Sequence, residues 1–332
     1  MLFRSGVVDG HFRGGRLGEV AYLIDGLSVN DAYTGSQMIN LEPNSIEEVE
    51  VISGTFNAEY GQAMSGVVNI VSKEPRSKLS GQFSAYSGAY LSGRSTPYAT
   101  KAGEGLKRWD YHEKEVSYAE LAGLNDVYDL QGNLSGSLLF KHVLFFTSVR
   151  QIMDGGYLYG KRVFEPSDSS SLPSDRNLWN IDATGDGEFV PMNWAKRLNA
   201  HGKLIFKPLS SHKLTYEFVY EDGESQYYSH MYKYNPDGMP TSYHESYSHM
   251  LHYDYVINPS GFINFKFANL TKDYNTYLYK SPYDSRYVPN TRFDISAGRR
   301  FYMAGTNMNH SYRQNTTRIF KSDLTYQVDR FN

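Results

Sequence analysis

The chain has 332 residues, of which 15% are aromatic and 29 are tyrosine, and it contains no cysteine. The lack of cysteine excludes disulfides and thiolate metal sites, and a net charge of -3 without a basic run argues against nucleic acid as a partner. No apolar run of about 18 residues occurs, so the sequence predicts no transmembrane helix, and a spanning structure could only be a closed β-barrel.

The first 75 residues pair short β-prone runs with turn residues, which favours a small mixed α+β domain. The runs cover residues 22–24, 49–52 and 67–71. Asp25-Gly26 between two apolar runs is a hairpin signal. Glutamates at 47, 48 and 50 alternate with valines, a pattern that suits a domain whose outside meets a polar, hydrated wall.

Five pieces of this stretch follow one another in an order that resembles the second half of the plug domain of TonB-dependent outer-membrane receptors. The pieces are Arg13-Gly14, the Ile24-Asp25-Gly26 turn, the strand at 46–51 that ends at Gly54, Glu59-Tyr60-Gly61, and the run 66–71. The variants RGGR, FNAEYG and SGVVNIVSK look most like the Oar-like receptors of the carboxypeptidase-regulatory-domain group.

The resemblance implies structural or gating roles for a set of plug-motif residues. They are Arg13, Gly14, Arg16, Asp25, Gly26, Glu47, Glu50, Gly54, Tyr60, Gly61, Gly66 and Asn69. It also implies that Arg13 joins a charged network between plug and barrel. A second arginine of that network is often found just before the Gly54 step, but Ser53 stands there, so we expect a weaker network or one that runs through Arg16.

Residues 1–5 lack the charged, apolar and small-residue segments of a secretory signal and lead directly into plug-like sequence. We therefore expect an internal fragment of a longer protein. The signal peptide, any TonB-contacting segment and the first half of the plug would lie upstream.

From Leu79 onward polar and apolar residues alternate with period two, the pattern of strands with one oily and one wet face. In one example, Leu198 and Leu204 fall on one parity, and His201 and Lys203 fall on the other. The pattern recurs about eight times up to residue 328 and predicts about eight strands.

The connections between these strands alternate in length. They are short near 141, 208–212 and 258–261, and long and polar near 92–127, 158–195, 229–246 and 280–311. Short turns at one end and long loops at the other are typical of outer-membrane barrels. We expect a mainly β chain in which 1–75 is the C-terminal part of a plug and 76–332 is the first part, roughly a third, of an antiparallel barrel of about 22 strands. A soluble all-β sandwich or propeller is the alternative.

Asp182, Thr184, Asp186 and Glu188 supply oxygens at alternate positions around Gly187, as in the front of a calcium loop. Asn193 stands where a bidentate glutamate would close such a loop. Two interpretations therefore remain open, a calcium site in an extracellular loop and a solvated acidic turn. We expect no other cofactor.

Six tyrosines crowd the region between residues 227 and 247. They are Tyr227, Tyr228, Tyr232, Tyr234, Tyr243 and Tyr247. Their rings could stack on a sugar or an apolar ligand, or they could form the aromatic girdle at a membrane boundary.

The resemblance implies energy-coupled uptake of a bulky or scarce ligand across the outer membrane of a Gram-negative bacterium. The implied partners are outer-membrane lipid, an unknown small or polymeric ligand, and the TonB-ExbB-ExbD complex, reached through a segment missing from this chain. We find no nucleophile elbow or paired-carboxylate site, so we expect no enzyme. The alternatives are an Oar-like surface protein acting in adhesion or protein export, and a soluble all-β binding module.

Overall fold

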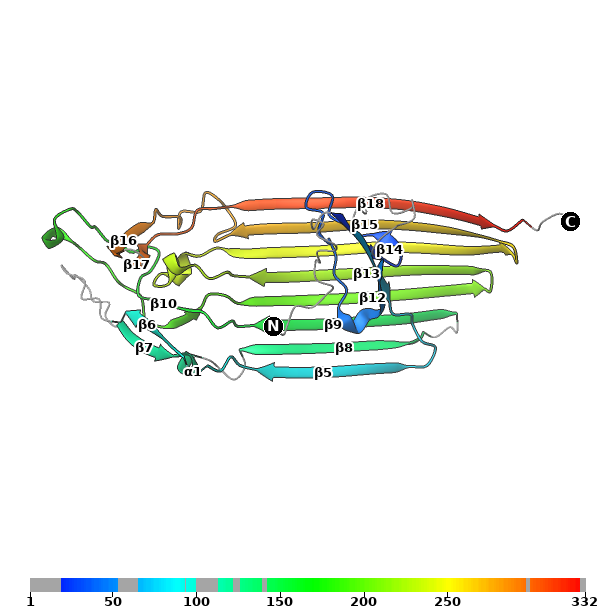
Figure 1. Ribbon diagram of the computed structural model, residues 1–332, viewed down its shortest axis with the longest axis horizontal. Helices are drawn as coiled ribbons and strands as arrows, with labels where there is room; N and C mark the ends of the chain where they lie inside the picture. The colour runs from blue at the N-terminus through cyan, green and yellow to red at the C-terminus, as the bar shows by residue number, and fades with distance from the viewer. Residues whose placement is uncertain are drawn as a thin grey trace.

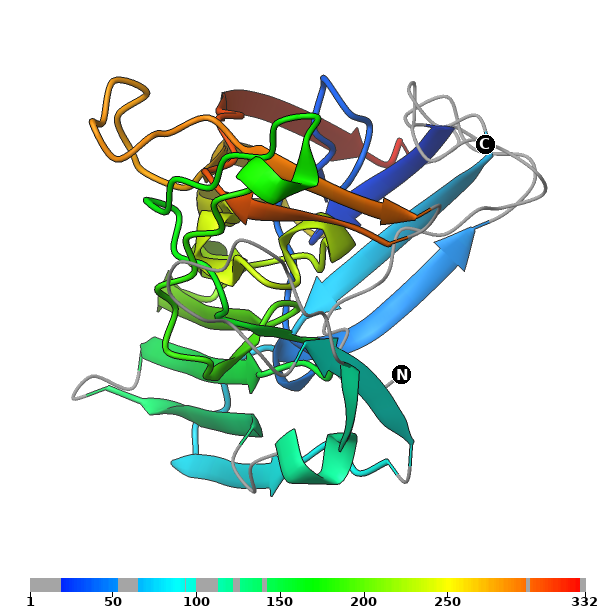
Figure 2. The ribbon, with the colours of Figure 1, turned by 90° about the vertical axis from the view of Figure 1, so that its left-hand side faces the viewer.

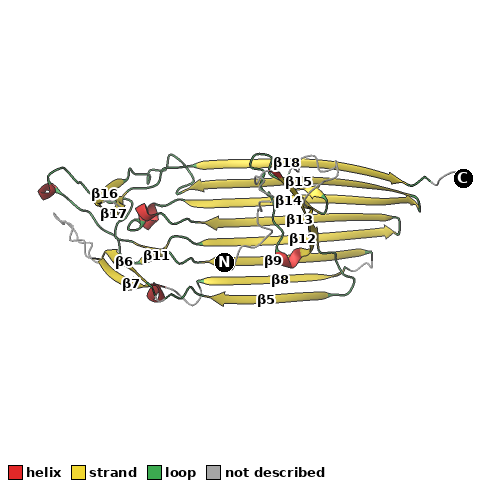
Figure 3. Ribbon diagram, in the orientation of Figure 1, coloured by secondary structure: helices red, strands yellow, loops and turns green. Residues whose placement is uncertain are grey.

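A computed structural model describes residues 19–52, 65–92, 94–99, 113–121, 126–138, 142–296 and 299–328. Strands dominate it, and the few helices are short (Figure 3). Among the described residues, no helix is both long and apolar enough to cross a membrane.

The amino-terminal part forms a small sheet of four strands. It contains β1 (Val20–Ile24), β2 (Leu27–Ser28), β3 (Ile46–Ile52) and β4 (Gly66–Ser72), in the order β2-β1-β4-β3. The predicted hairpin is confirmed: Ile24 pairs with Leu27, and Asp25 and Gly26 both have positive φ, 47° and 77°, as a type I′ turn requires. A 3-10 turn, Pro43–Ser45, leads into β3. We call residues 19–75 of this structure the small domain.

The rest of the chain is built on a large sheet of eight antiparallel strands. They are β5 (Ser80–Gly88), β8 (Val127–Ser137), β9 (Val143–Asp154), β12 (Ala195–Leu209), β13 (His212–Ser225), β14 (Thr241–Asn258), β15 (Gly261–Tyr277) and β18 (Ser311–Tyr326). Each strand of the large sheet pairs with its neighbours along the chain, in the order β18-β15-β14-β13-β12-β9-β8-β5. The eight predicted strands are confirmed.

Figure 1 shows these strands side by side, with short turns at one end and long loops at the other. Viewed end-on in Figure 2, the large sheet is bowed, and the strands of the small domain lie on its hollow side. The two parts share one apolar core: Tyr22, Ile24 and Ile70 of the small domain cluster with Met250 and Leu270 of the large sheet.

The long loops contain secondary structure that the sequence analysis did not predict. Three hairpins and one short helix lie in them: β6 (Ser95–Ala99) with β7 (Glu113–Ser117), α1 (Tyr118–Leu121), β10 (Tyr159–Lys161) with β11 (Phe189–Pro191), and β16 (Thr291–Ser296) with β17 (Arg299–Ala304). Three 3-10 turns, Arg176–Leu178, His230–Tyr232 and Pro236–Gly238, lie in them as well. The loop expected at 229–246 is shorter than predicted. It ends where β14 begins at Thr241, because residues 242–246 continue the ladder with β13.

Candidate functional site

The two faces of the large sheet have opposite chemistry. Polar residues on the side of the small domain are buried: Lys203 is 5% exposed and Glu217 is 0% exposed. Apolar residues on the other side are exposed, with Leu204 at 42% and Phe206 at 43%. We call these the inward and the outward face, and the interface between the inward face and the small domain is the candidate site.

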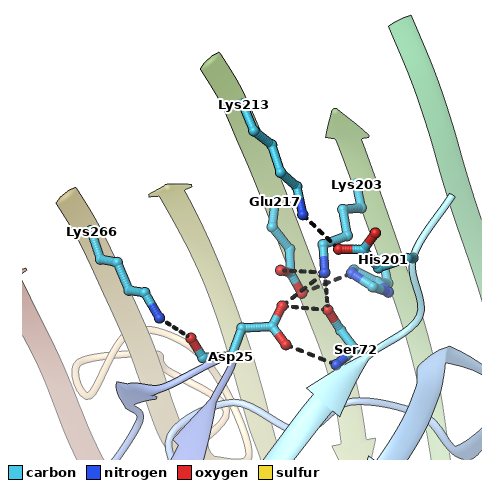
Figure 4. Close-up of polar contacts among 8 residues, drawn as sticks. Asp25, Ser72, His201, Lys203, Lys213, Glu217 and Lys266 are labelled. Atoms are coloured by element: carbon cyan, nitrogen blue, oxygen red, sulfur yellow. Dashed lines mark hydrogen bonds and ion pairs between the residues drawn. The ribbon is translucent and has the colours of Figure 1, made fainter. Parts of the chain in front are cut away.

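Asp25 at the tip of the β1-β2 turn is the centre of this interface (Figure 4). Lys203 Nζ of β12 lies 2.8 Å from Asp25 Oδ2 and donates a hydrogen bond to it. Within the small domain, the Ser72 hydroxyl donates to Asp25 Oδ2 over 2.6 Å and the Ser72 amide donates to Asp25 Oδ1 over 2.9 Å. Asp25 therefore joins the end of β4 to the wall of the large sheet.

The electrostatics of Asp25 follow from these contacts. Burial by itself raises the pKa of the Asp25 carboxyl, but the Lys203 ammonium and the hydrogen bonds from Lys203 and Ser72 outweigh it and lower the pKa to about 2. Asp25 is therefore charged throughout the physiological pH range.

The wall surrounds this ion pair with further polar groups. Glu217 on β13 has one carboxylate oxygen 3.7 Å from Lys203 Nζ and the other 3.0 Å from His201 Nε2. Lys266 on β15 donates from Nζ to the Asp25 carbonyl over 2.8 Å. Gly26 has a φ of 77°, so the turn favours glycine there, and a Cβ at this position would lie 3.0 Å from the same flexible Nζ.

A second polar contact lies at Glu42, just before the 3-10 turn of the small domain. The Arg150 guanidinium of β9 pairs with Glu42, and it also donates to both carboxylate oxygens of Asp129 on β8, over 2.9 and 2.6 Å. Asn199 of β12 donates a further hydrogen bond to Glu42. Arg150 is only 9% exposed, so this is a buried, multiply bonded ion pair.

Several further polar contacts cross the interface. Asn315 donates to both oxygens of Asp31 over 2.8 and 2.9 Å, and Lys213 Nζ lies 2.7 Å from Glu74. Three others join Lys272 to the Gln37 carbonyl at 3.3 Å, Arg313 to the Tyr33 ring at 5.9 Å, and Asn40 to Glu221 at 3.4 Å.

The structure tests only some of the placements predicted for the plug motif. Arg13, Gly14, Arg16, Gly54, Tyr60 and Gly61 lie outside the described residues. Gly66 opens β4 opposite Val20, and Asn69 pairs with Leu23 on one side and Glu50 on the other. Glu47 and Glu50 lie exposed on β3, which is an edge strand of the small sheet.

Sequence reasoning missed most residues of the interface. Lys203, His201 and Asn199 could have been found, because they share the wet parity of their strand. Glu42 carries no comparable signal: its partners lie more than a hundred residues away and depend on how the small domain docks.

Three of the four residues predicted to bind calcium form hydrogen bonds with residues outside the set. Asp186 accepts a hydrogen bond from Arg162 at 2.7 Å, Thr184 donates to Asp168 at 2.5 Å, and Asp182 accepts from the Ser169 amide at 3.1 Å. The Glu188 amide donates to Asp186 over 2.9 Å. Within the described ranges, no group of three or more His, Asp or Glu side chains could hold a metal ion. Calcium in this loop stays a prediction.

The six tyrosines fall into different environments rather than one surface. Tyr232 and Tyr234 are buried at 5% and 2% exposure in cores of the loops, whereas Tyr227 is 73% exposed and Tyr228 packs at the edge of a loop core. Tyr243 and Tyr247 lie on the outward face of β14. A contact of these tyrosines with ligand stays a prediction.

The outward face carries rows of aromatic rings that span several strands. Tyr243 of β14 stacks on Tyr277 of β15 with ring centroids 4.7 Å apart, and Tyr277 continues to Tyr312 of β18 at 5.9 Å. Nearer the short turns, His212 stacks on Tyr255 at 4.7 Å. On β18, Tyr312 lies eight residues before Phe320, where the continuous run of exposed apolar residues begins, so the row from Tyr243 to Tyr312 lies beyond that apolar surface. A girdle role for Tyr243 and Tyr247 stays a prediction.

The long loops pack against one another above the sheet. Tyr98, Phe164, Ile181, Tyr234 and Phe301 come from four different loops and share one core, which we call the loop core. The Arg162 guanidinium also joins two of these loops, by pairing with Asp186 and Asp237. A cavity of about 600 Å³ lies at the side of this assembly and is lined by residues 90–92, 94–96 and 157–159.

The apolar band of the outward face runs obliquely across the sheet. Exposed apolar residues extend from Leu130 to Leu138 at β8 and from Phe320 to Val328 at β18. Followed from partner to partner across the sheet, Leu130 of β8 lies level with Gln314 of β18, six strands away. The apolar residues of β18 begin only at Phe320, six residues further along that strand. The apolar band therefore shifts by about 20 Å along the strands over about 29 Å across the sheet, which is a slope of about 35°. That slope and the run of about nine residues are those of strands that cross an outer membrane.

The comparisons with known proteins agree with this geometry. Residues 5–68 match the family model of the TonB-dependent receptor plug domain. The outer membrane transporter YddB from Escherichia coli shares the fold, with a TM-score of 0.59 and 14% identity over 96% of this chain. The chain spans 39% of that transporter.

Weaker similarity extends to two further receptors. The ferric yersiniabactin uptake receptor FyuA from Yersinia pestis has a TM-score of 0.48 and 15% identity over 78% of this chain and 32% of its own. The siderophore receptor PirA from Pseudomonas aeruginosa has a TM-score of 0.44 and 14% identity over 80% of this chain and 37% of its own. The small domain thus matches a plug, and the predicted fold class of plug plus antiparallel barrel strands is confirmed.

Proposed function

We propose that this chain supplies part of the plug and eight wall strands of a TonB-dependent receptor that imports a ligand across the outer membrane of a Gram-negative bacterium. One observation carries the proposal: the same strands bind a plug through a buried polar face and expose an oblique apolar band on the other face. A soluble sandwich would cover its apolar face with a second sheet.

The edges of the large sheet support a larger ring. Among the described residues, β5 pairs only with β8, and β18 pairs only with β15. Unpaired backbone groups are not tolerated in lipid, so further strands must join these edges and close the barrel.

The ligand is expected to bind on the side of the long loops, which fold together above the plug. No energy source exists in the outer membrane, so the proposal requires a pull on the plug from the TonB-ExbB-ExbD complex. The buried ion pairs at Asp25 and Glu42 are the contacts that such a pull has to loosen.

Within this family, we propose membership of the Oar-like group, which rests on the variants RGGR, FNAEYG and SGVVNIVSK. That assignment favours a second candidate function, adhesion or protein export at the cell surface.

The test has two arms. The complete receptor should partition with the outer-membrane fraction, and cells should accumulate its ligand only when TonB is functional. A product in the soluble fraction would overturn the whole proposal. Membrane localisation with unimpaired accumulation in cells lacking TonB, together with a loss of adhesion or secreted protein on deletion of the receptor, would favour the second function.

A further inference from the structure

The ion pairs between plug and wall have a consistent direction. Three ion pairs cross the interface in the part of the chain that the structure describes, and they join Asp25 to Lys203, Glu42 to Arg150, and Glu74 to Lys213. In each of them the small domain supplies the carboxylate and the large sheet supplies the cation.

Other contacts repeat this polarity. Lys266 and Lys272 donate to backbone carbonyls of the small domain, and the Arg313 guanidinium lies over the Tyr33 ring. Each of these three wall cations meets an electron-rich plug group, which is a carbonyl oxygen or an aromatic face. Asn315 likewise donates to the Asp31 carboxylate.

The acidic residues of the wall have their polar partners mainly within the wall. Glu221 has His244 at 3.1 Å and Arg197 at 3.9 Å, Glu217 has His201 and Lys203, and Asp129 is held by Arg150. Over the inward positions of the eight strands, Lys and Arg outnumber Asp and Glu. The plug therefore supplies negative charge that balances an electropositive wall.

We infer that withdrawal of the plug exposes an electropositive path along this part of the wall, and that the path favours an anionic cargo. This inference rests on the proposed function. Lys203 lies on the inward face of β12, and Lys266 and Lys272 lie on that of β15, two strands further along the sheet than the neighbour of β12. All three lose their plug partner together. Pores lined by lysine and arginine select anions for the same electrostatic reason.

The inference is tested by the ion selectivity of the opened receptor. The complete receptor is placed in a planar bilayer with a KCl gradient, and urea is added to displace the plug, whose small sheet has four strands against the eight of the wall. We expect the open path to pass Cl⁻ better than K⁺. The triple variant Lys203→Gln, Lys266→Gln, Lys272→Gln should lower the Cl⁻/K⁺ permeability ratio by about threefold.

Two matched controls separate wall charge from general damage. Lys196→Gln removes a cation of β12 on the outward face, where it pairs with Glu224, and should leave the ratio unchanged. Asp25→Asn changes the plug alone, so it should leave the selectivity of the open path unchanged as well.

The outcomes distinguish failure of the inference on anionic cargo from failure of the transport proposal. A conducting path that prefers K⁺, or one whose selectivity does not respond to the triple variant, overturns the inference and leaves the transport proposal standing. No urea-dependent conductance from the native receptor overturns the transport proposal itself. If the triple variant fails to insert, the Cl⁻/K⁺ selectivity of the native receptor by itself supports or overturns the inference.

Discussion

The inward and outward faces of the large sheet are built from the same strands, but they have opposite polarity and opposite exposure. Lys203 and Leu204 are neighbours in the chain, yet the lysine is 5% exposed and the leucine is 42% exposed. In a water-soluble protein this pattern would be reversed. The difference teaches that the sheet is matched to two environments at once, a polar plug on one side and hydrocarbon on the other.

The comparison also separates two kinds of stabilisation. Contacts on the inward face are specific, because buried charges have named partners at short distances. Contacts on the outward face require only that the apolar band extends far enough along the strands, so they tolerate exchange of one apolar residue for another. Substitutions on the inward face should therefore weaken plug docking, whereas substitutions on the outward face should lower stability in lipid.

The largest effect is expected from Lys203→Ala on the inward face. The change leaves Asp25 and Glu217 buried without their ammonium partner and should weaken plug docking by about 3–5 kcal/mol. Hydrogen exchange of the β4 amides measures this as lost protection. The control Lys196→Ala, on the outward face of the same strand, should cost less than about 1 kcal/mol, and equal exchange in both variants would contradict the prediction.

Leu204→Arg probes the outward face at the adjacent residue. A charge within the apolar band should destabilise the inserted protein by about 2–4 kcal/mol, measured by denaturant titration in lipid vesicles. Gln151→Arg on β9 lies just beyond the band and should cost about 0–1 kcal/mol. If both arginines are tolerated equally, the outward face does not contact hydrocarbon.

Acid should weaken the inward contact at Asp25. Lys203 and the hydrogen bonds overcome the opposing effect of burial and lower the Asp25 pKa from 3.8 to about 2 in the folded state. The stabilisation, about 2 kcal/mol, is therefore present above pH 3.8 and is lost as the pH falls through about 2. Plug protection measured between pH 5 and about 2 should fall in the native protein and change less in Asp25→Asn. A decline that is complete above pH 4 would contradict this assignment.

The smallest effect is expected in the loops, away from both faces. Arg162 pairs with Asp186 and Asp237 at partly exposed positions, so Arg162→Ala should cost less than about 1 kcal/mol. Limited proteolysis should show slightly faster cleavage of residues 155–194. Arg286→Ala removes a pair within a single loop and should not change that rate, so a similar effect of both would show that the contact between loops has no special role.

The sequence predicted the strands better than the contacts between them. Period-two alternation is a local signal, and it placed Leu198 and Leu204 on the same apolar face. The Asp25-Gly26 pair is a local turn signal, and it predicted the hairpin. The start of β14 was missed because Tyr243, His244 and Glu245 read as loop residues, although they continue the ladder. Ladder continuity depends on the neighbouring strand, which a local pattern does not contain.

The candidate site was predictable only in part for the same reason. The wet parity of β12 placed Lys203 on the right face, but its partner Asp25 is 178 residues away. The pairing is fixed by the docking of one domain on another, and no spacing rule encodes that docking. The tyrosines near residue 230 looked like one aromatic patch, whereas the fold distributes them between loop cores and the outward face.

The shared loop core limits how the surface of this protein can be altered. Because Phe164, Tyr234 and Phe301 come from different loops and pack together, transplanting one loop from a relative would remove part of the support of the others. Short peptide tags should be tolerated only at the tips, such as the one carrying Tyr283, which is 94% exposed. Antibodies raised against a single loop as a free peptide should bind the intact protein poorly, since each loop takes its shape from its neighbours.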